Sequence, residues 1–92
     1  MHTEELLRKY AAGERDFRRV ILRGAELTEA SLVHVILSQA DLRKVNLAGA
    51  NLSGANLVGA DLSRANLTGV ILRQVDLRRA VLTRAVLCIW LT

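Results

Sequence analysis

The sequence predicts an all-β solenoid, a β-helix whose backbone turns a corner after every five residues. Three observations predict it. A leucine recurs at every fifth position over most of the chain, a small apolar residue stands two positions before each leucine, and the 92 residues contain no proline. In such a solenoid the coils stack through backbone hydrogen bonds, and the inward side chains form ladders along its length.

The leucine interval is unbroken from residue 17 onward. An interval of five excludes a long α-helix, because each step turns by about 140° net and would spread the leucines around all sides. It also excludes a flat strand, in which successive leucines would face opposite sides of the sheet. The predicted core ladder consists of Phe17, Leu22, Leu27, Leu32, Leu37, Leu42, Leu47, Leu52, Leu57, Leu62, Leu67, Leu72, Leu77, Leu82 and Leu87.

The small apolar residues form a second inward column of alanine and valine, which runs from Val20 to Ala85. The repeating unit is therefore small-x-Leu-x-x. Aromatic residues make up only 3% of the chain, so aliphatic side chains must fill the core. Burial of each leucine contributes about 2 kcal/mol.

Several units have Asp or Asn directly before the leucine: Ala40-Asp41-Leu42, Ala50-Asn51-Leu52, Ala55-Asn56-Leu57, Ala60-Asp61-Leu62 and Ala65-Asn66-Leu67. They resemble the pentapeptide-repeat family, whose pattern is A-[DN]-L-x-x, over roughly residues 15 to 92. The segment 6–17 resembles leaders that precede the repeats in cyanobacterial members. The resemblance implies a right-handed quadrilateral β-helix with four pentapeptides in each coil, and about four coils in this chain.

Seven units depart from the pattern at the position before the leucine, and we expect weaker hydrogen bonding at those corners. They carry Ile21, Glu26, Ser31, Ile36, Ile71, Val81 and Val86. Glycine follows two positions after several leucines, where a left-handed backbone would suit a corner. These glycines are Gly24, Gly49, Gly54, Gly59 and Gly69.

The first residues follow a different pattern, which predicts a short amphipathic helix over residues 3–12. Its apolar face would hold Leu6, Leu7, Tyr10 and Ala11, with Thr3 as N-cap and Gly13 as the stop. An open β-edge invites aggregation, so we expect this helix to cap the first coil. The chain then divides into a capping helix, residues 1–14, and a β-helix, residues 15–92.

The last residues are apolar at positions that should face outward, and no second cap follows them. We expect homodimerisation through this end, with a self-capped monomer and a truncated reading frame as the alternatives. The candidate dimer interface consists of Val86, Cys88, Ile89, Trp90 and Leu91.

Basic residues outnumber acidic ones, which gives a net charge of +4. With four pentapeptides in each coil, five cations gather on one side of the solenoid as a candidate anionic-partner surface: Arg23, Arg43, Lys44, Arg64 and Arg84. Arg18, Arg19, Arg78 and Arg79 add to the preceding side. Like charges stacked one coil apart repel by about 1 kcal/mol in water, so an anionic partner would relieve them. The alternative is a solvated face partly neutralised by neighbouring aspartates.

No catalytic residue, metal site or cofactor site is indicated. Asp41 and Asp61 stack as a carboxylate pair, but a convex face has no pocket to exclude water. His34 and Cys88 would lie on the order of 14 Å apart, too far to share a metal. The single cysteine requires no oxidising compartment, and neither a signal sequence nor a stretch of 18 apolar residues is present. A cytoplasmic location without membrane contact is the expectation.

Two functions remain from the sequence. We expect a non-enzymatic interaction module that docks another protein, and the alternative is a basic scaffold that binds nucleic acid or another anionic surface. Some members of the resembled family mimic duplex DNA and occupy type II topoisomerases. Their surfaces are acidic, so the net positive charge of this chain disfavours that role.

Overall fold

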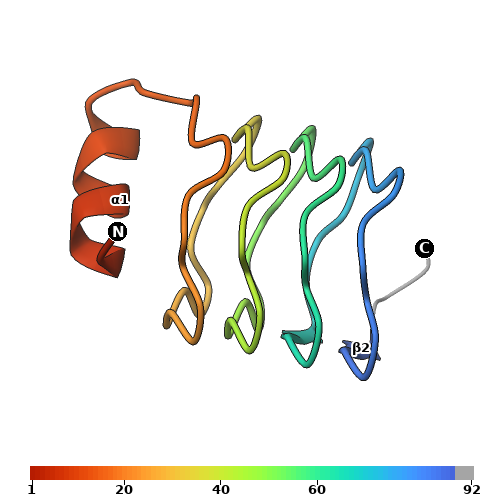
Figure 1. The fold of residues 1–92 in the computed structure, drawn as a ribbon. Coiled ribbons are helices and arrows are strands. Elements are labelled where there is room, and N and C mark those ends of the chain that lie inside the picture. Colours follow the sequence, from red (N-terminus) through yellow and green to blue (C-terminus); the bar gives the residue numbers. More distant parts are fainter. Residues whose placement is uncertain (89–92) are drawn as a thin grey trace.

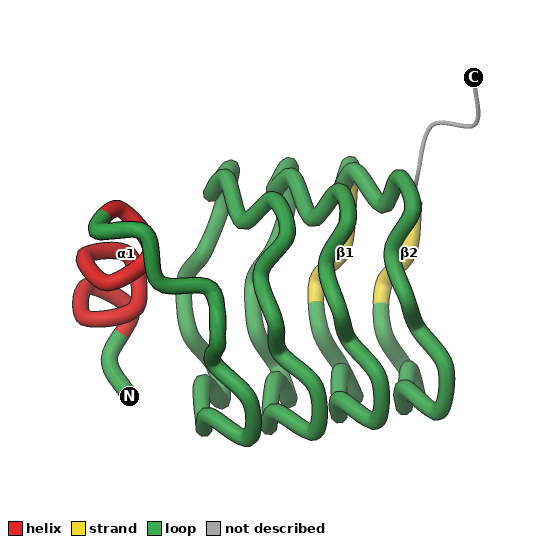
Figure 2. The backbone as a smooth tube through the Cα atoms, turned by 90° about the horizontal axis from the view of Figure 1, so that it is seen from above, coloured by secondary structure: helices red, strands yellow, loops and turns green. Residues whose placement is uncertain are grey.

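The computed structural model describes residues 1–88, which form one short helix followed by stacked coils (Figure 1). The helix is α1, Thr3–Ala11. Two short strands, β1 (Asn66–Thr68) and β2 (Val86–Cys88), pair in parallel. Elsewhere the coils are joined by isolated parallel bridges rather than by longer strands. The tube view shows α1 lying across one end of the stack (Figure 2).

The bridges join residues 20 positions apart, as in the pairs Asp16↔Ile36 and Ile21↔Asp41. Backbone amides link the coils in both directions: Leu22 donates to the Asp41 carbonyl at 2.8 Å, and Asp41 donates to the Val20 carbonyl at 2.9 Å. Each coil therefore takes four pentapeptides, and pentapeptides one coil apart form a stack. The β-helical solenoid expected from the five-residue interval is present in the described residues.

Each corner is a β-turn that begins at the inward leucine. The Ala25 amide donates to the Leu22 carbonyl at 3.0 Å, and the intervening Gly24 has a φ of 70°. A positive φ at the third turn residue is typical of a type II turn, which favours glycine there. The predicted corner role of the glycines is confirmed. The same position also holds nine non-glycine residues with φ between 58° and 63°: Arg19, Glu29, His34, Gln39, Lys44, Arg64, Gln74, Arg79 and Arg84.

Aspartate and asparagine before the leucine support these corners through their side chains. Asn51 Oδ1 accepts the Ser53 amide at 3.0 Å, and Asn56 Oδ1 accepts the Val58 amide at 3.0 Å. Such side-chain bonds to the backbone two residues on are typical of Asx-turns. Within the described residues, none of the seven departing positions makes this bond. Five of them carry isoleucine or valine, which have no acceptor, and Glu26 instead accepts Asn46 Nδ2 at 3.1 Å.

The core is the predicted aliphatic ladder together with the smaller inward column. Phe17 and the leucines from Leu22 to Leu67 are buried, and so are the small residues from Val35 to Val70. Leu72, Leu77 and Leu82 are only partly buried, although they pack against the core. Leu87 is 50% exposed, so its assignment to the buried ladder was wrong. Its coil has no further coil within residues 1–88 to cover it.

The helix covers the first coil, and Leu6 is its only fully buried residue. Tyr10 is half-buried, and its hydroxyl donates to the Val33 carbonyl at 2.8 Å. The predicted apolar face was too wide, because Leu7 and Ala11 are exposed where α1 turns away from the coil.

The helix begins at residue 3 as predicted and ends one residue before the predicted residue 12, but the predicted N-cap was wrong. Gly13, with a φ of 101°, follows the helix, and its amide donates to the Tyr10 carbonyl at 2.9 Å. The N-cap is His2 and not Thr3, which is the first helical residue, and His2 makes no side-chain cap bond. Within residues 1–88, no helix has the length and apolarity that crossing a membrane requires.

Candidate interaction surfaces

Charge is distributed unevenly over the four stacks of pentapeptides. The stack that contains Asp41 comprises residues 20–24, 40–44, 60–64 and 80–84 and holds five cations and two carboxylates. We call it the Asp41 stack. The preceding stack, with Asp16 and Asp76, has the same charge count. The other two stacks together hold one arginine and two glutamates, so the positive charge gathers on two adjacent stacks, as the sequence predicted.

The Asp41 stack brings all five predicted cations together but neutralises two of them. Asp41 Oδ2 accepts Nη2 of Arg23 at 2.9 Å and Nη2 of Arg43 at 2.9 Å. Arg43 Nε also lies 3.9 Å from Asp61 Oδ2 on the next coil. Arg23, Asp41, Arg43 and Asp61 therefore form a first row along the stack, in which cations and carboxylates alternate. The hydrogen bond from Arg43, with a further bond from Arg23, holds the pKa of Asp41 well below its ordinary value.

The remaining three cations, Lys44, Arg64 and Arg84, form the second row of this stack, which we call the cation strip. All three are exposed, and none has an ion-pair partner among residues 1–88. A shallow hollow of about 450 Å³ lies between the two rows. It is lined by Arg23, Arg43, Lys44, Ser63 and Arg64. The geometry provides donors and positive charge for a carboxylate or a phosphate.

The Asp16 stack carries local ion pairs, which agrees with the partial neutralisation by neighbouring aspartates that the sequence offered as an alternative. Arg18 Nη2 lies 2.8 Å from Asp16 Oδ2, and Arg78 Nη2 lies 2.7 Å from Asp76 Oδ2. The hydrogen bonds from these arginines lower the pKa of each aspartate. The signal was available in the sequence, because aspartate stands two positions before arginine in both units and again in Asp41-Leu42-Arg43.

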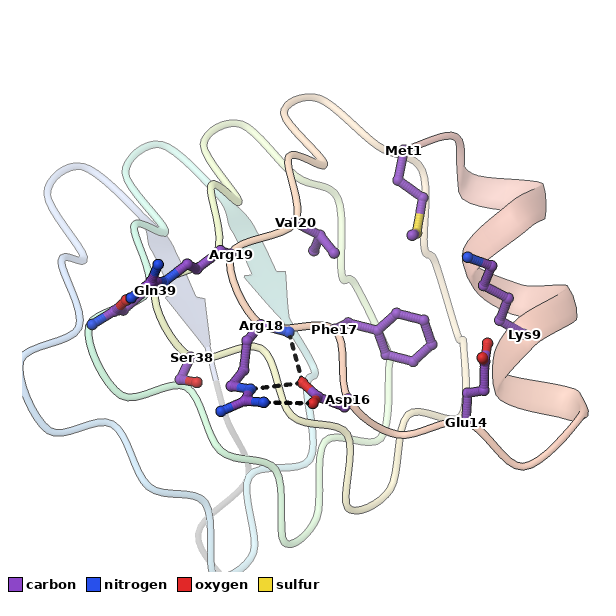
Figure 3. A pocket seen from close by; sticks show the side chains of 10 residues that line it. All are labelled: Met1, Lys9, Glu14, Asp16, Phe17, Arg18, Arg19, Val20, Ser38 and Gln39. Carbon is purple, nitrogen blue, oxygen red and sulfur yellow. Dashed lines mark hydrogen bonds and ion pairs between the residues drawn. The ribbon is translucent and has the colours of Figure 1, made fainter.

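A groove of about 780 Å³ lies between α1 and the first coil (Figure 3). Its lining includes Lys9 and Glu14 from the helical segment and Asp16, Phe17 and Arg19 from the coil. The Arg15 guanidinium stacks over the Tyr10 ring, with Cζ 3.7 Å from the ring centroid. Sequence reasoning missed this groove, because it depends on how the helix lies against the coil.

The opposite end of the solenoid exposes its core. The leucines from Leu52 to Leu87 line a small, wholly apolar hollow between the last two coils. Around it Val81, Val86 and Leu87 are exposed large hydrophobic residues. Cys88 is an exposed free thiol beside them. The structure therefore places Val86 and Cys88 of the candidate dimer interface at an apolar end, whereas Ile89, Trp90 and Leu91 lie outside the described residues.

The residues that the sequence analysis considered for catalysis or metal binding either lie apart or are hydrogen-bonded to close neighbours. Asp41 and Asp61 are bridge partners on neighbouring coils, as expected. Asp61 accepts the Ser63 hydroxyl at 2.5 Å and the Ser63 amide at 3.0 Å, and these bonds lower its pKa. Among residues 1–88, no three His, Cys, Asp or Glu side chains come together as a metal site.

Several solved structures that match the chain are pentapeptide repeat proteins. HetL, a pentapeptide repeat protein involved in heterocyst differentiation regulation from the cyanobacterium Nostoc sp. strain PCC 7120, is 48% identical with a TM-score of 0.91. The match covers 92% of this chain and 36% of HetL. A pentapeptide repeat protein from the Arabidopsis thaliana thylakoid lumen is 29% identical with a TM-score of 0.76, over 82% of this chain and 52% of that one.

A second Nostoc pentapeptide repeat protein is 38% identical with a TM-score of 0.61, over 88% of this chain and 75% of that protein. This chain thus spans about a third of HetL and about half of the Arabidopsis protein. None of the curated proteins matches it. The family model for pentapeptide repeats matches residues 16–47 and 46–84 with 8 copies. The leucine ladder, the stacked five-residue corners and this match establish that the chain belongs to the pentapeptide-repeat family.

Proposed function

We propose that this chain is a non-enzymatic protein-interaction module, a right-handed four-sided β-helix of about four coils that docks a second copy of itself through its last coil. The family comparisons indicate no catalytic family. HetL is described as involved in the regulation of heterocyst differentiation, and a docking module fits a regulatory role of that kind.

The observation that carries the proposal is the contrast between the two ends of the leucine ladder. At the first coil, α1 covers the core and leaves Leu6 fully buried. At the last described coil, Val86 is 55% and Leu87 is 50% exposed. Large exposed apolar residues gathered around an open core are typical of an interaction surface.

A second copy suits this end because the last coil presents both partners of a backbone hydrogen bond. One coil earlier, the Leu57 and Leu62 amides donate to the carbonyls of Asp76 and Val81 at 2.8 and 2.7 Å. The corresponding amides of Leu77 and Leu82 have no coil above them within residues 1–88. The carbonyls of Val75 and Ala80 are equally open there. A two-fold symmetric contact needs donors and acceptors on the same patch, and this edge has both.

The size of the end predicts a weak dimer. The two shorter extents of the molecule, 24 and 22 Å, bound an end face of about 500 Å², so two copies would bury about 1,000 Å² in total. That area is at the lower limit for a specific interface, so we expect a dissociation constant on the order of micromolar.

Sedimentation equilibrium from about 1 to 500 μM tests the proposal. The wild type should shift from monomer to dimer over this range, and Leu87→Glu should remain monomeric because it would place a charge in the apolar contact. Leu7→Glu is the matched control, since Leu7 is an exposed leucine at the α1 end. It should dimerise as the wild type does. A wild type that stays monomeric throughout, or equal loss in both variants, would contradict docking through the last coil.

The alternative of a nucleic-acid scaffold is less well supported. Aspartates neutralise Arg23 and Arg43, and the Asp41 stack contains no aromatic side chain on which a base could stack. Duplex-DNA mimicry requires a negative surface, whereas this chain has a net charge of +4.

A further inference from the structure

We propose that the cation strip, Lys44, Arg64 and Arg84, is a docking site for an acidic α-helix of a partner protein. The strip lies along a side of the solenoid, whereas the proposed dimer contact lies at its end. Only Arg84 lies in the coil that the proposed dimer contact uses, whereas Lys44 and Arg64 lie in earlier coils, and a peptide titration and a dimerisation measurement test the two sites separately.

The backbone fixes the spacing of the strip. Lys44, Arg64 and Arg84 occupy the left-handed corner position in three consecutive coils, with φ values of 59°, 61° and 59°. The Lys44 amide donates to the Ser63 carbonyl at 2.9 Å, and the Arg64 amide donates to the Thr83 carbonyl at 2.8 Å. Successive cations are therefore held about one interstrand spacing apart, roughly 4.8 Å.

The strip carries charge that the molecule does not balance. Its neighbours Arg23 and Arg43 are tied to Asp41 at 2.9 Å, whereas the strip residues have no carboxylate within ion-pair distance in the described chain. Three like charges in an exposed row repel one another, and carboxylates from a partner would relieve that repulsion. The hollow of about 450 Å³ beside Lys44 and Arg64 has room for such groups, and the Ser63 hydroxyl in its lining already donates to Asp61.

An α-helix presents carboxylates at a matching interval. Glutamates three or four residues apart lie on one helix face with their Cβ atoms about 5–6 Å apart. A helix aligned with the solenoid axis could thus set one carboxylate opposite each cation. Straight, rigid strips with a fixed spacing favour such a partner over a flexible acidic segment, because less conformational entropy is lost on binding.

Nucleic acid fits the same strip less well. The affinity of a protein for duplex DNA rises with the number of phosphates that its cations neutralise, and the strip supplies three cations. Asp41 and Asp61 also lie in the adjoining row, 19% and 38% exposed, and would repel a continuous phosphate backbone. The observations therefore favour a protein helix with spaced carboxylates.

Isothermal titration with synthetic helical peptides tests the inference. One alanine-rich peptide carries three glutamates in a single stripe at intervals of four, and a second has the same composition with its glutamates spread around the helix. The striped peptide should bind the wild-type chain, and the dispersed peptide should bind about tenfold more weakly because only one carboxylate at a time can meet the strip.

A charge-matched pair of variants locates the site. The strip variant combines Lys44→Gln, Arg64→Gln and Arg84→Gln, which the fold accepts at this position because Gln39 and Gln74 have φ values of 58° there. The control variant combines Arg19→Gln, Arg73→Gln and Arg79→Gln and removes three cations from other stacks. Affinity for the striped peptide should fall about tenfold in the strip variant and less than about twofold in the control.

Several results would overturn the inference. Among them are no binding of the striped peptide, equal affinity for the two peptides, and equal loss of affinity in the two variants. A DNA duplex that binds the wild type more tightly than the striped peptide, and that the strip variant no longer binds, would make the strip a nucleic-acid site instead. Circular dichroism of both variants checks that the solenoid remains folded.

Discussion

His34 lies over Gly54, one coil further along the chain, so that a Cβ at Gly54 would come within 2.6 Å of His34 Cε1. Both residues occupy the left-handed corner position, with φ values of 62° and 69°. Gly24 occupies the same position with a φ of 70°, but a Cβ there would meet nothing within 4 Å. The Gly54 corner therefore favours glycine for space as well as for backbone conformation, whereas the Gly24 corner favours it for conformation alone.

We expect Gly54→Ala to destabilise the chain more than Gly24→Ala. The Gly24 variant measures the cost of alanine at a positive φ, about 1 kcal/mol. At Gly54 the exposed His34 ring must also move away, which adds up to about 1 kcal/mol. Urea unfolding of both variants, and of Gly54→Ala combined with His34→Gly, checks this. The additional cost should disappear in the double variant, and equal costs at Gly24 and Gly54 would show that His34 does not restrict this corner.

We expect Ile21→Asn to stabilise the fold. Ile21 is 62% exposed and stands where Asn46, Asn51 and Asn56 accept the amide two residues on at 3.0–3.1 Å. Asparagine at position 21 would accept the Arg23 amide in the same way and add about 1 kcal/mol to the free energy of unfolding. Ile21→Ala is the control, because it removes the exposed apolar side chain without adding an acceptor. If both variants change stability alike, the side-chain acceptor has no role at this corner.

We expect the ion pairs of Asp41 to make stability depend on pH below about 4. The Arg43 and Arg23 guanidiniums hold the folded-state pKa of Asp41 below the unfolded value of about 3.9. Its contribution is therefore complete above the unfolded pKa and is lost as the pH falls through the lower, folded pKa. The pKa values of Asp16, Asp61 and Asp76 are lowered in the same direction.

Asp41→Asn separates the ion pairs from the turn. Asparagine retains the side-chain oxygen that accepts the Arg43 amide at 3.2 Å but carries no charge. Urea unfolding between pH 7 and pH 3 should show a smaller loss of stability for Asp41→Asn than for the wild type. Asp41→Ala should be less stable than Asp41→Asn at every pH, because it also loses the turn bond. Parallel curves for the wild type and Asp41→Asn would mean that these ion pairs do not contribute.

The sequence was sufficient for the ladder because the pattern is local and repeated. Fifteen consecutive units place an inward side chain at the same interval, and the described structure buries those from Phe17 to Leu67. It was insufficient at the two ends, where the repeats stop. There the exposure of Leu7 and Leu87 depends on what covers a coil, which no five-residue pattern records.

The candidate surface could be predicted only in part. Stacking at 20-residue offsets placed Arg23, Arg43, Lys44, Arg64 and Arg84 on one stack, as expected. Which of them remain free could not be foreseen, because it depends on side-chain geometry. Arg43 reaches back to Asp41 two positions before it, and Arg23 reaches up one coil to the same carboxylate.

The sequence by itself determined the five-residue corner and the aliphatic interior. Each unit contains the residues that form its corner. These are an inward leucine and, in many units, an Asp or Asn side chain that accepts the backbone amide two residues later. Only the tertiary structure decided how Arg23 meets Asp41, how His34 lies over Gly54, and where α1 leaves a groove. These contacts join residues from different coils or elements, so their geometry exists only once the coils have stacked and the helix has packed against them.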